Sequence, residues 1–248
     1  LLTEAGFHEV VLTGIHLGAY GIDLAARPTL SDACRTALAC GGLKRLRLGS
    51  LESVELSAEL LELIRTEPRF AAHLHLPLQA GCDNVLRVMN RHYTTEDFAR
   101  LIEGVRAAVP GVAISTDIIV GFPGETEEDF AAGLDFVRRM GFARMHVFPY
   151  SARRGTPAAQ RTDQVPPTVR KERAARMQAL AQELAEAYHR SQLGSVQEVL
   201  FETQEDGITD GLTETYVRVY TDADVARGEI VPMRLTHLYR DGLWGEVL

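Results

Sequence analysis

Hydroxyl, amide, carboxylate and imidazole groups recur at the ends of five apolar segments in the first 150 residues. In chain order they are Thr13 with His16, Ser50 with Glu52, Gln79, Asp117, and His146 with Tyr150. In a parallel β/α barrel the active site gathers at the carboxyl ends of the strands. We therefore expect these groups to meet at one rim and to surround a small-molecule pocket.

Residues 117–130 join a strand, a tight turn and the start of a helix. The preceding residues, 112–120, are rich in β-branched side chains, as a buried parallel strand should be. Gly121, Pro123 and Gly124 then break the strand. This order favours a turn that cradles a ligand, although an ordinary strand-to-helix connection with a good cap has the same pattern.

The helix after this turn has an acidic beginning. Thr126 can cap it, with Asp129 three residues further on. Glu125, Glu127 and Glu128 surround the same end and would repel an anion. A phosphate site would instead offer bare amides and a lysine, so we do not expect a phosphate here.

The histidines permit a second interpretation, in which they bind a metal ion. His73 and His75 lie on one face of a strand, as metal ligands do in barrel hydrolases, and Asp117 or His146 could supply a third ligand. Both residues precede the end of their strand, which favours buried, hydrogen-bonded residues below the site. We assign no metal ligand.

Strands and helices are expected to alternate as far as Tyr150. The expected strands are 9–15, 44–49, 72–78, 112–120 and 143–150, and the expected helices are 30–39, 58–66, 96–108 and 127–140. This alternation of strands and helices predicts an α/β fold with parallel strands joined by right-handed crossovers.

The pattern changes after Tyr150. A long helix is expected from Thr168 to about Arg190, followed by short strands at 196–202, 215–220, 230–237 and 243–248. Turns are expected at Asp206-Gly207, Asp210-Gly211 and Asp241-Gly242. We expect a partial β/α barrel over 1–165, a linking helix over 166–190 and a small antiparallel β-barrel over 191–248.

Composition and charge narrow the class of protein. The 248 residues are 46% hydrophobic and no apolar run is long enough for a membrane span, so we expect a cytoplasmic protein with no membrane partner. Residues 191–248 hold four basic and eleven acidic residues, a net charge of −7, whereas residues 153–176 carry a net charge of +5. Residues 153–176 are thus the one locally basic stretch of the sequence.

The sequence resembles the radical S-adenosylmethionine (SAM) methylthiotransferases, which add a methylthio group to tRNA adenosines or to a ribosomal protein. The matching segments are 12–24, 76–81, 89–94, 117–130 and 146–158, and the last 58 residues resemble the RNA-associated TRAM module, best at 211–216. The motif Thr-Gly-Ile-His-x-Gly-x-Tyr-Gly at residues 13–21 is most similar to the branch that modifies N6-threonylcarbamoyladenosine at position 37, in the anticodon stem-loop.

The resemblance implies strands two to six of a six-stranded radical SAM barrel that binds SAM against a [4Fe-4S] cluster. Gly14 and His16 would lie near the methionine end of SAM, and Ser50, Glu52 and Gln79 near its ribose and polar edges. The remaining implied SAM contacts are Asp117, Gly121, Pro123, Gly124, Phe148 and Tyr150, most of them around the adenine. The resemblance assigns no catalytic residue in this chain.

The chain departs from the family in its cysteines. The family holds its radical cluster with a Cys-x3-Cys-x2-Cys loop and a second cluster with further cysteines, and Cys34, Cys40 and Cys82 match neither set. Because the chain also begins with Leu1 rather than Met, we expect a fragment that makes no radical by itself.

The resemblance also implies tRNA as partner. Since the presumed RNA module is acidic, we expect phosphate contacts from Arg153, Arg154, Arg170, Lys171 and Arg173, with a local barrel face near Tyr216, Arg218 and Arg234. These arginines could instead serve only as the solvent-exposed face of a helix. The alternative functions are methylthiolation of isopentenyladenosine-37 or of a ribosomal protein, or a SAM- and RNA-binding module without turnover.

Overall fold

The computed structural model describes residues 2–248, and Leu1, from which the fragment was expected to begin, lies outside them. The chain divides into two compact units. Unit 1 comprises Leu1–His75, Arg106–Ala113 and Ala187–Leu248, and unit 2 comprises Leu76–Val105 and Ile114–Glu186. In the described residues, no helix is long and apolar enough to cross a membrane.

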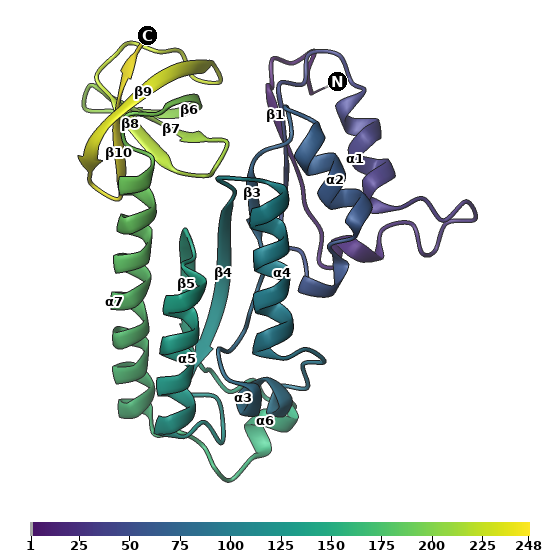
Figure 1. Cartoon of the computed structure of the whole chain (residues 1–248), viewed down its shortest axis with the longest axis vertical. Coiled ribbons are helices and arrows are strands. Elements are labelled where there is room, and N and C mark those ends of the chain that lie inside the picture. Colours follow the sequence, from purple (N-terminus) through teal and green to yellow (C-terminus); the bar gives the residue numbers. More distant parts are fainter. Residues whose placement is uncertain (1) are drawn as a thin grey trace. The chain divides into compact units, whose positions relative to one another are not determined.

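The first part of unit 1 holds two paired parallel strands and two helices. They are β1 (Glu9–Leu12), α1 (Leu30–Leu38), β2 (Arg45–Leu48) and α2 (Ala58–Thr66), with the short 3-10 turns η1 (Leu17–Ala19) and η2 (Ser53–Glu55). Thr29 and Ser57 cap the two helices by accepting amide hydrogen bonds. Figure 1 shows α1 and α2 side by side.

The second sheet has the order β3-β4-β5. Its elements and connections are β3 (His73–His75), α3 (Asp83–Val88), α4 (Thr95–Ala108), β4 (Ala113–Val120), α5 (Glu127–Met140), β5 (Arg144–Pro149) and α6 (Pro157–Gln160). Strands β4 and β5 pair in parallel from Ser115 opposite Arg144 to Val120 opposite Pro149. The predicted α/β class and all five expected strands are confirmed, while α3 and α6 were not expected.

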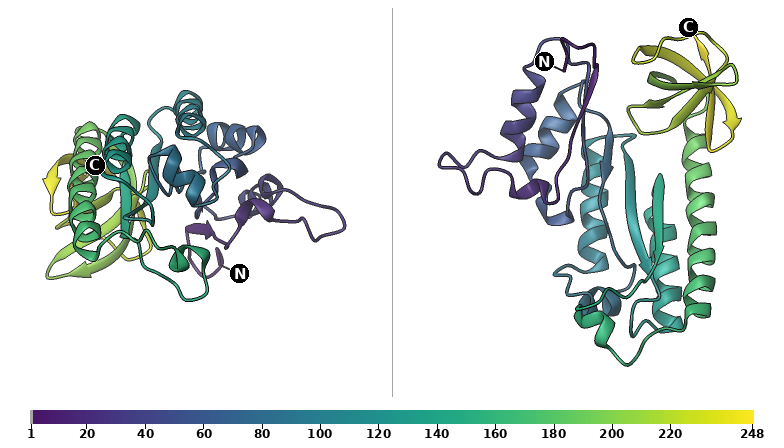
Figure 2. Two further views of the ribbon diagram at one scale, coloured as in Figure 1. Left: turned by 90° about the horizontal axis from the view of Figure 1, so that it is seen from below. Right: turned by 180° about the vertical axis from the view of Figure 1, so that it is seen from behind.

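The burial along β4 and β5 shows which face is covered. In β5 the more exposed residues, Arg144, His146 and Phe148, alternate with half-buried Met145 and Val147. In β4, Ile118 is buried and Asp117 half-buried. Helix α5 lies beside α7 (Pro167–Ser191) in both views of Figure 2, and Arg176 of α7 pairs with Glu127 of α5 at 2.7 Å.

The end of unit 1 is a closed five-stranded barrel with the order β10-β8-β7-β6-β9 (Figure 1, green to yellow). Its strands are β6 (Val196–Glu205), β7 (Ile208–Thr213), β8 (Arg218–Thr221), β9 (Ile230–Tyr239) and β10 (Gly242–Val247). The core contains Val199, Phe201, Val219, Met233 and Leu243, all completely buried.

One turn predicted in the barrel is wrong. Asp210-Gly211 lies within β7, where Gly211 pairs with Phe201 of β6. A Cβ at Gly211 would collide with the Leu200 carbonyl, so glycine here allows two backbones to approach closely. The turn at Asp206-Gly207 is where it was expected, between β6 and β7.

Candidate functional site

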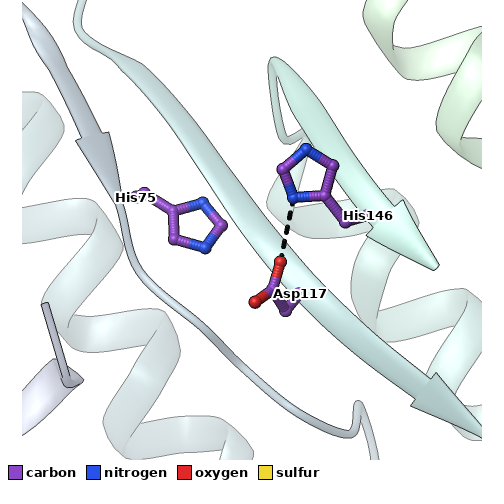
Figure 3. Close-up of side chains that lie close together, drawn as sticks. All are labelled: His75, Asp117 and His146. Carbon is purple, nitrogen blue, oxygen red and sulfur yellow. Dashed lines mark hydrogen bonds and ion pairs between the residues drawn. The ribbon is translucent and has the colours of Figure 1, made fainter. Parts of the chain in front are cut away.

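Asp117 of β4 and His146 of β5 are expected site side chains that contact each other directly. They lie opposite each other in the strand register, and His146 Nδ1 is 3.0 Å from Asp117 Oδ1 (Figure 3). The Asp117 side chain is 28% exposed and the His146 side chain is 44% exposed. A carboxylate in this position fixes the orientation and tautomer of the imidazole. The pair can therefore position a hydrogen-bonding or proton-exchanging group on the β4–β5 face.

Gln79 lies beside this pair with unusual backbone geometry. Its φ of 71° is in the left-handed region, which for a residue other than glycine costs about 1–3 kcal/mol. Two hydrogen bonds to β4 hold it there: its N–H donates to the Asp117 carbonyl at 2.9 Å, and its carbonyl accepts from Ile119 at 2.8 Å. The structure thus fixes the backbone of Gln79 against β4, next to Asp117.

The turn after β4 is closed by its own side chains. The Gly121 N–H donates to Glu125 Oε1 at 2.9 Å, and Arg173 NH1 donates to the same oxygen at 2.7 Å. Burial raises the pKa of Glu125, and the Gly121 N–H and Arg173 oppose that rise. Since a protein carboxylate already occupies this amide, the arrangement agrees with the expectation that no phosphate binds here.

Aromatic rings flank the turn. Phe122 and Tyr150 meet edge to face with their centroids 5.1 Å apart, and Phe148 is 49% exposed. The Gly124 N–H donates to the Asp163 carbonyl at 3.0 Å, which ties the turn to the segment before α7. An exposed ring next to ordered backbone suits a flat, apolar ligand such as adenine.

The remaining SAM candidates, Gly14, His16, Ser50 and Glu52, lie in unit 1. Glu55, which the sequence analysis missed, organises this region. Its carboxylate lies 2.9 Å from His16 Nδ1 and accepts the N–H groups of Gly18 at 3.2 Å and Glu52 at 3.1 Å. The spacing Glu52-x-x-Glu55, typical of a capping box, was the signal that could have identified it.

Within unit 2, Asp117 and His146 each offer one atom that could bind a metal ion. Two such groups are fewer than the three protein ligands of a catalytic zinc site. His73, the first residue of the histidine motif, is buried and stacks on Tyr216 with the ring centroids 4.9 Å apart. His73 is thus a core residue, as its position before the end of the strand favoured.

The three cysteines do not fit a [4Fe-4S] cluster, whose ligands are thiolates. Cys34 is completely buried, and burial raises its pKa to about 11. Burial also raises the pKa of Cys82, whose thiol donates to Asp129 at 3.2 Å. Cys40 is exposed at the end of α1. Two of the three are therefore held as neutral thiols.

The expected RNA contacts divide into exposed and buried residues. Arg153, Arg154 and Lys171 are exposed, and Arg170 is half-buried with NH1 donating to the Tyr150 carbonyl at 2.6 Å. Arg173 is 5% exposed and forms ion pairs with Glu125 and Glu127. The expectation that Arg173 contacts RNA is corrected, because the fold uses its charge internally.

The barrel residues expected to face RNA are also engaged within unit 1. Arg218 pairs with Asp210, and Arg234 donates to the Gly194 carbonyl. The Tyr216 ring stacks on His73 and lies 4.8 Å below the Arg47 guanidinium. Tyr216 therefore contacts two side chains of unit 1 while remaining 36% exposed.

Two buried arginines of β2 connect the first part of unit 1 to the barrel. Arg45 and Arg47 both pair with Glu9, at 3.0 and 2.8 Å, and they are almost completely buried. Their other N–H groups donate to the carbonyls of Glu198, Leu212, Thr213 and Glu214 in the barrel. Because each charge is paired and hydrogen-bonded, its burial is compensated.

The fold and sequence comparisons agree on a class. A model of the radical SAM superfamily matches residues 4–137. The solved structure of coproporphyrinogen III oxidase HemN from Escherichia coli, described as a radical SAM enzyme, shares the fold with a TM-score of 0.52 and 18% identity, over 90% of this chain and 57% of that one. This chain belongs to the radical SAM superfamily.

Within that class the chain is similar to tRNA-modifying enzymes. It is 38% identical to the threonylcarbamoyladenosine tRNA methylthiotransferase MtaB of Bacillus subtilis, over 94% of this chain and 53% of the relative. It is also 38% identical to the tRNA-2-methylthio-N(6)-dimethylallyladenosine synthase of Caldicellulosiruptor saccharolyticus, over 100% of this chain and 53% of the relative. The chain spans about half the length of these relatives.

Proposed function

We propose that this chain is the C-terminal part of a tRNA methylthiotransferase that acts on N6-threonylcarbamoyladenosine at position 37, in the anticodon stem-loop. The observation that carries the proposal is the similarity to MtaB along nearly the whole chain. The resemblance of the motif at residues 13–21 favours the same branch. With tRNA as its substrate, the protein is proposed to act in the cytoplasm.

The cofactor would be SAM, and when bound against a reduced [4Fe-4S] cluster it supplies a 5′-deoxyadenosyl radical. Asp117, Gln79 and Phe148 fit one part of SAM, because they offer hydrogen bonds and an exposed ring within unit 2. Gly121, Pro123, Gly124 and Tyr150 form the adjoining turn in unit 2. For Gly14, His16, Ser50 and Glu52 of unit 1, the proposed SAM contacts rest on the family resemblance alone. Asp117 would hold the His146 ring in one orientation against the ligand.

The cluster does not fit this chain, since Cys34 and Cys82 are held as neutral thiols and Cys40 is exposed by itself. We place the cluster ligands outside these 248 residues and expect no reductive cleavage of SAM by this chain alone. In that state the chain is a binding module for SAM and RNA.

A second substrate is favoured by the equal identity to the dimethylallyladenosine-modifying relative. The two nucleosides differ in polarity at N6: threonylcarbamoyl carries a carboxylate and a hydroxyl, and dimethylallyl is apolar. A protein that discriminates between them must recognise this group.

Mass spectrometry of tRNA nucleosides from cells that lack the full-length protein tests the function. We expect the methylthio form of N6-threonylcarbamoyladenosine to disappear and its unmethylthiolated precursor to accumulate, with both restored by the reintroduced gene. Loss of the methylthio form of isopentenyladenosine would assign the other branch. Unchanged levels of both nucleosides would contradict tRNA methylthiolation.

A further inference from the structure

The outer face of the barrel in unit 1 carries aromatic side chains across three adjacent strands. Trp244 of β10 lies opposite Tyr220 of β8 on one side and opposite His237 of β9 on the other. Directly opposed residues on paired strands share a face of the sheet. Tyr239 lies two residues beyond His237 and shares that face as well. We call Tyr220, His237, Tyr239 and Trp244 the aromatic row.

The neighbours of the aromatic row point the other way. Val219 and Leu243, which precede Tyr220 and Trp244, are completely buried in the barrel core, and Leu238 packs against the same core. A register shift between Trp244 and Gly245 brings His237 to the outside. The aromatic row is therefore on the outer surface of the barrel.

The rings of the row contact one another in sequence. Trp244 stacks on His237 with centroids 6.0 Å apart and planes 21° apart, and meets Tyr239 edge to face at 5.0 Å. Tyr239 meets Tyr220 at 5.2 Å, and the Arg240 guanidinium lies over both tyrosine rings, at 5.2 and 5.3 Å. The Tyr220 hydroxyl donates to Asp241. These contacts preorganise the row.

Exposure increases along the row from Tyr220 to His237. Tyr220 is buried, Tyr239 and Trp244 are half-buried and His237 is exposed, while the exposed Arg240 lies over the two tyrosine rings. An exposed imidazole stacked on a half-buried indole offers a flat surface that another planar group can cover. Such surfaces bind unstacked bases of single-stranded nucleic acids.

Charge around the row disfavours binding through phosphates. Arg240 neighbours Asp241, Arg218 pairs with Asp210, and residues 191–248 together carry a net charge of −7. A nucleic acid that binds here must gain its affinity from ring contacts rather than from neutralisation of its phosphates. Unpaired RNA bases meet this requirement, because every base has a π face and stacking tolerates any sequence.

We propose that the aromatic row is a stacking surface for unpaired bases of RNA, centred on His237 and Trp244. The proposal rests on the proposed function only in taking RNA as the partner. It gives the acidic barrel a way to bind RNA with few phosphate contacts of its own.

Fluorescence offers a direct test, because Trp244 is the only tryptophan in the 248 residues. The chain is titrated with a single-stranded oligoadenylate of about nine nucleotides and with an abasic oligomer of equal length and charge. We expect the oligoadenylate to quench Trp244 and to bind at least about 10-fold more tightly than the abasic oligomer. Equal binding of the two oligomers, or binding without quenching, would overturn the proposal.

Variants separate stacking from barrel stability, since the same rings also stabilise the sheet as cross-strand pairs. With fluorescently labelled oligoadenylate, Trp244→Ala and His237→Ala should each weaken binding by about 5- to 150-fold, and Trp244→Phe should retain it. His237 is exposed, so its variant tests the surface even if Trp244→Ala unfolds. Wild-type affinity in folded His237→Ala would overturn the proposal.

A matched pair of variants controls for the effect of removing a positive charge. Arg240→Ala should weaken binding, whereas Arg227→Ala, which removes the same charge from an exposed position outside the row, should not. Equal losses would point to simple electrostatics and overturn the stacking assignment. This test is independent of the nucleoside analysis. If RNA binding does not depend on the aromatic row, the proposal of tRNA methylthiolation is unaffected. If the nucleosides are unchanged, the quenching result is unaffected.

Discussion

At the scale of residues, short polar motifs fix the ends of helices. Thr126 and Asp129 form the capping box that the sequence predicted at α5, with the Asp129 N–H donating to Thr126 Oγ1 at 3.0 Å. Thr94 and Asp97 form the same arrangement at α4. The Thr-x-x-Asp spacing of this second motif is identical to that of the first.

Asp97 makes the stability of α4 depend on pH. Hydrogen bonds from Thr94 and from Arg100 lower the pKa of Asp97 from 3.8 to about 2. Because the folded state holds the carboxylate ionised, its stabilising effect is present above about pH 4 and is lost as the pH falls toward 2. We expect Asp97→Asn to reduce the slope of stability against pH in this window.

Urea unfolding at several pH values measures this effect. Glu103→Gln, an exposed change on the same helix, is the control and should leave the slope unchanged. Equal slopes for wild type and Asp97→Asn would show that the cap does not couple to protonation.

At the scale of elements, helix α5 packs against the turn that follows β3 through two glycines. A Cβ at Gly81 would lie 2.8 Å from the Gly133 carbonyl oxygen and 2.9 Å from its Cα. Neither backbone can move without separating the helix from the turn. Sequence spacing did not indicate this contact, because Gly81 and Gly133 are brought together only by the fold.

We expect Gly81→Ala to destabilise unit 2 by about 1–3 kcal/mol, the usual cost of overpacking. Gly104→Ala is the matched control: Gly104 lies in α4 with nothing within 4 Å of a Cβ, so alanine should stabilise by roughly 1 kcal/mol. Denaturant midpoints compare the two variants. A neutral or stabilising Gly81→Ala would contradict the close approach.

At the scale of the whole molecule, charge is divided between an acidic barrel and a basic stretch. Not all of the basic stretch is available to a partner, since Arg173 and Arg176 pair with Glu125 and Glu127. Arg153 and Arg154 are exposed. Phosphate contacts by these two arginines would each contribute to the salt dependence of RNA binding.

The double variant Arg153→Glu and Arg154→Glu should therefore weaken binding of tRNA and reduce the slope of log K against log salt by about 1.5. The measurement is tRNA affinity at several salt concentrations. Lys44→Glu with Arg227→Glu makes the same change of charge at other exposed positions and should leave the slope nearly unchanged. Equal changes in both double variants would mean that net charge alone governs binding.

The sequence by itself determined the local features: the order of strands and helices, the cap at Thr126 and the division of charge. Each depends on residues a few positions apart. Tertiary structure decided that Arg173 is buried while Arg153 is exposed, that Asp117 faces His146, and that Tyr220, His237 and Trp244 form one row. The physical reason is that strand register and burial join residues far apart in sequence, and no local spacing encodes them.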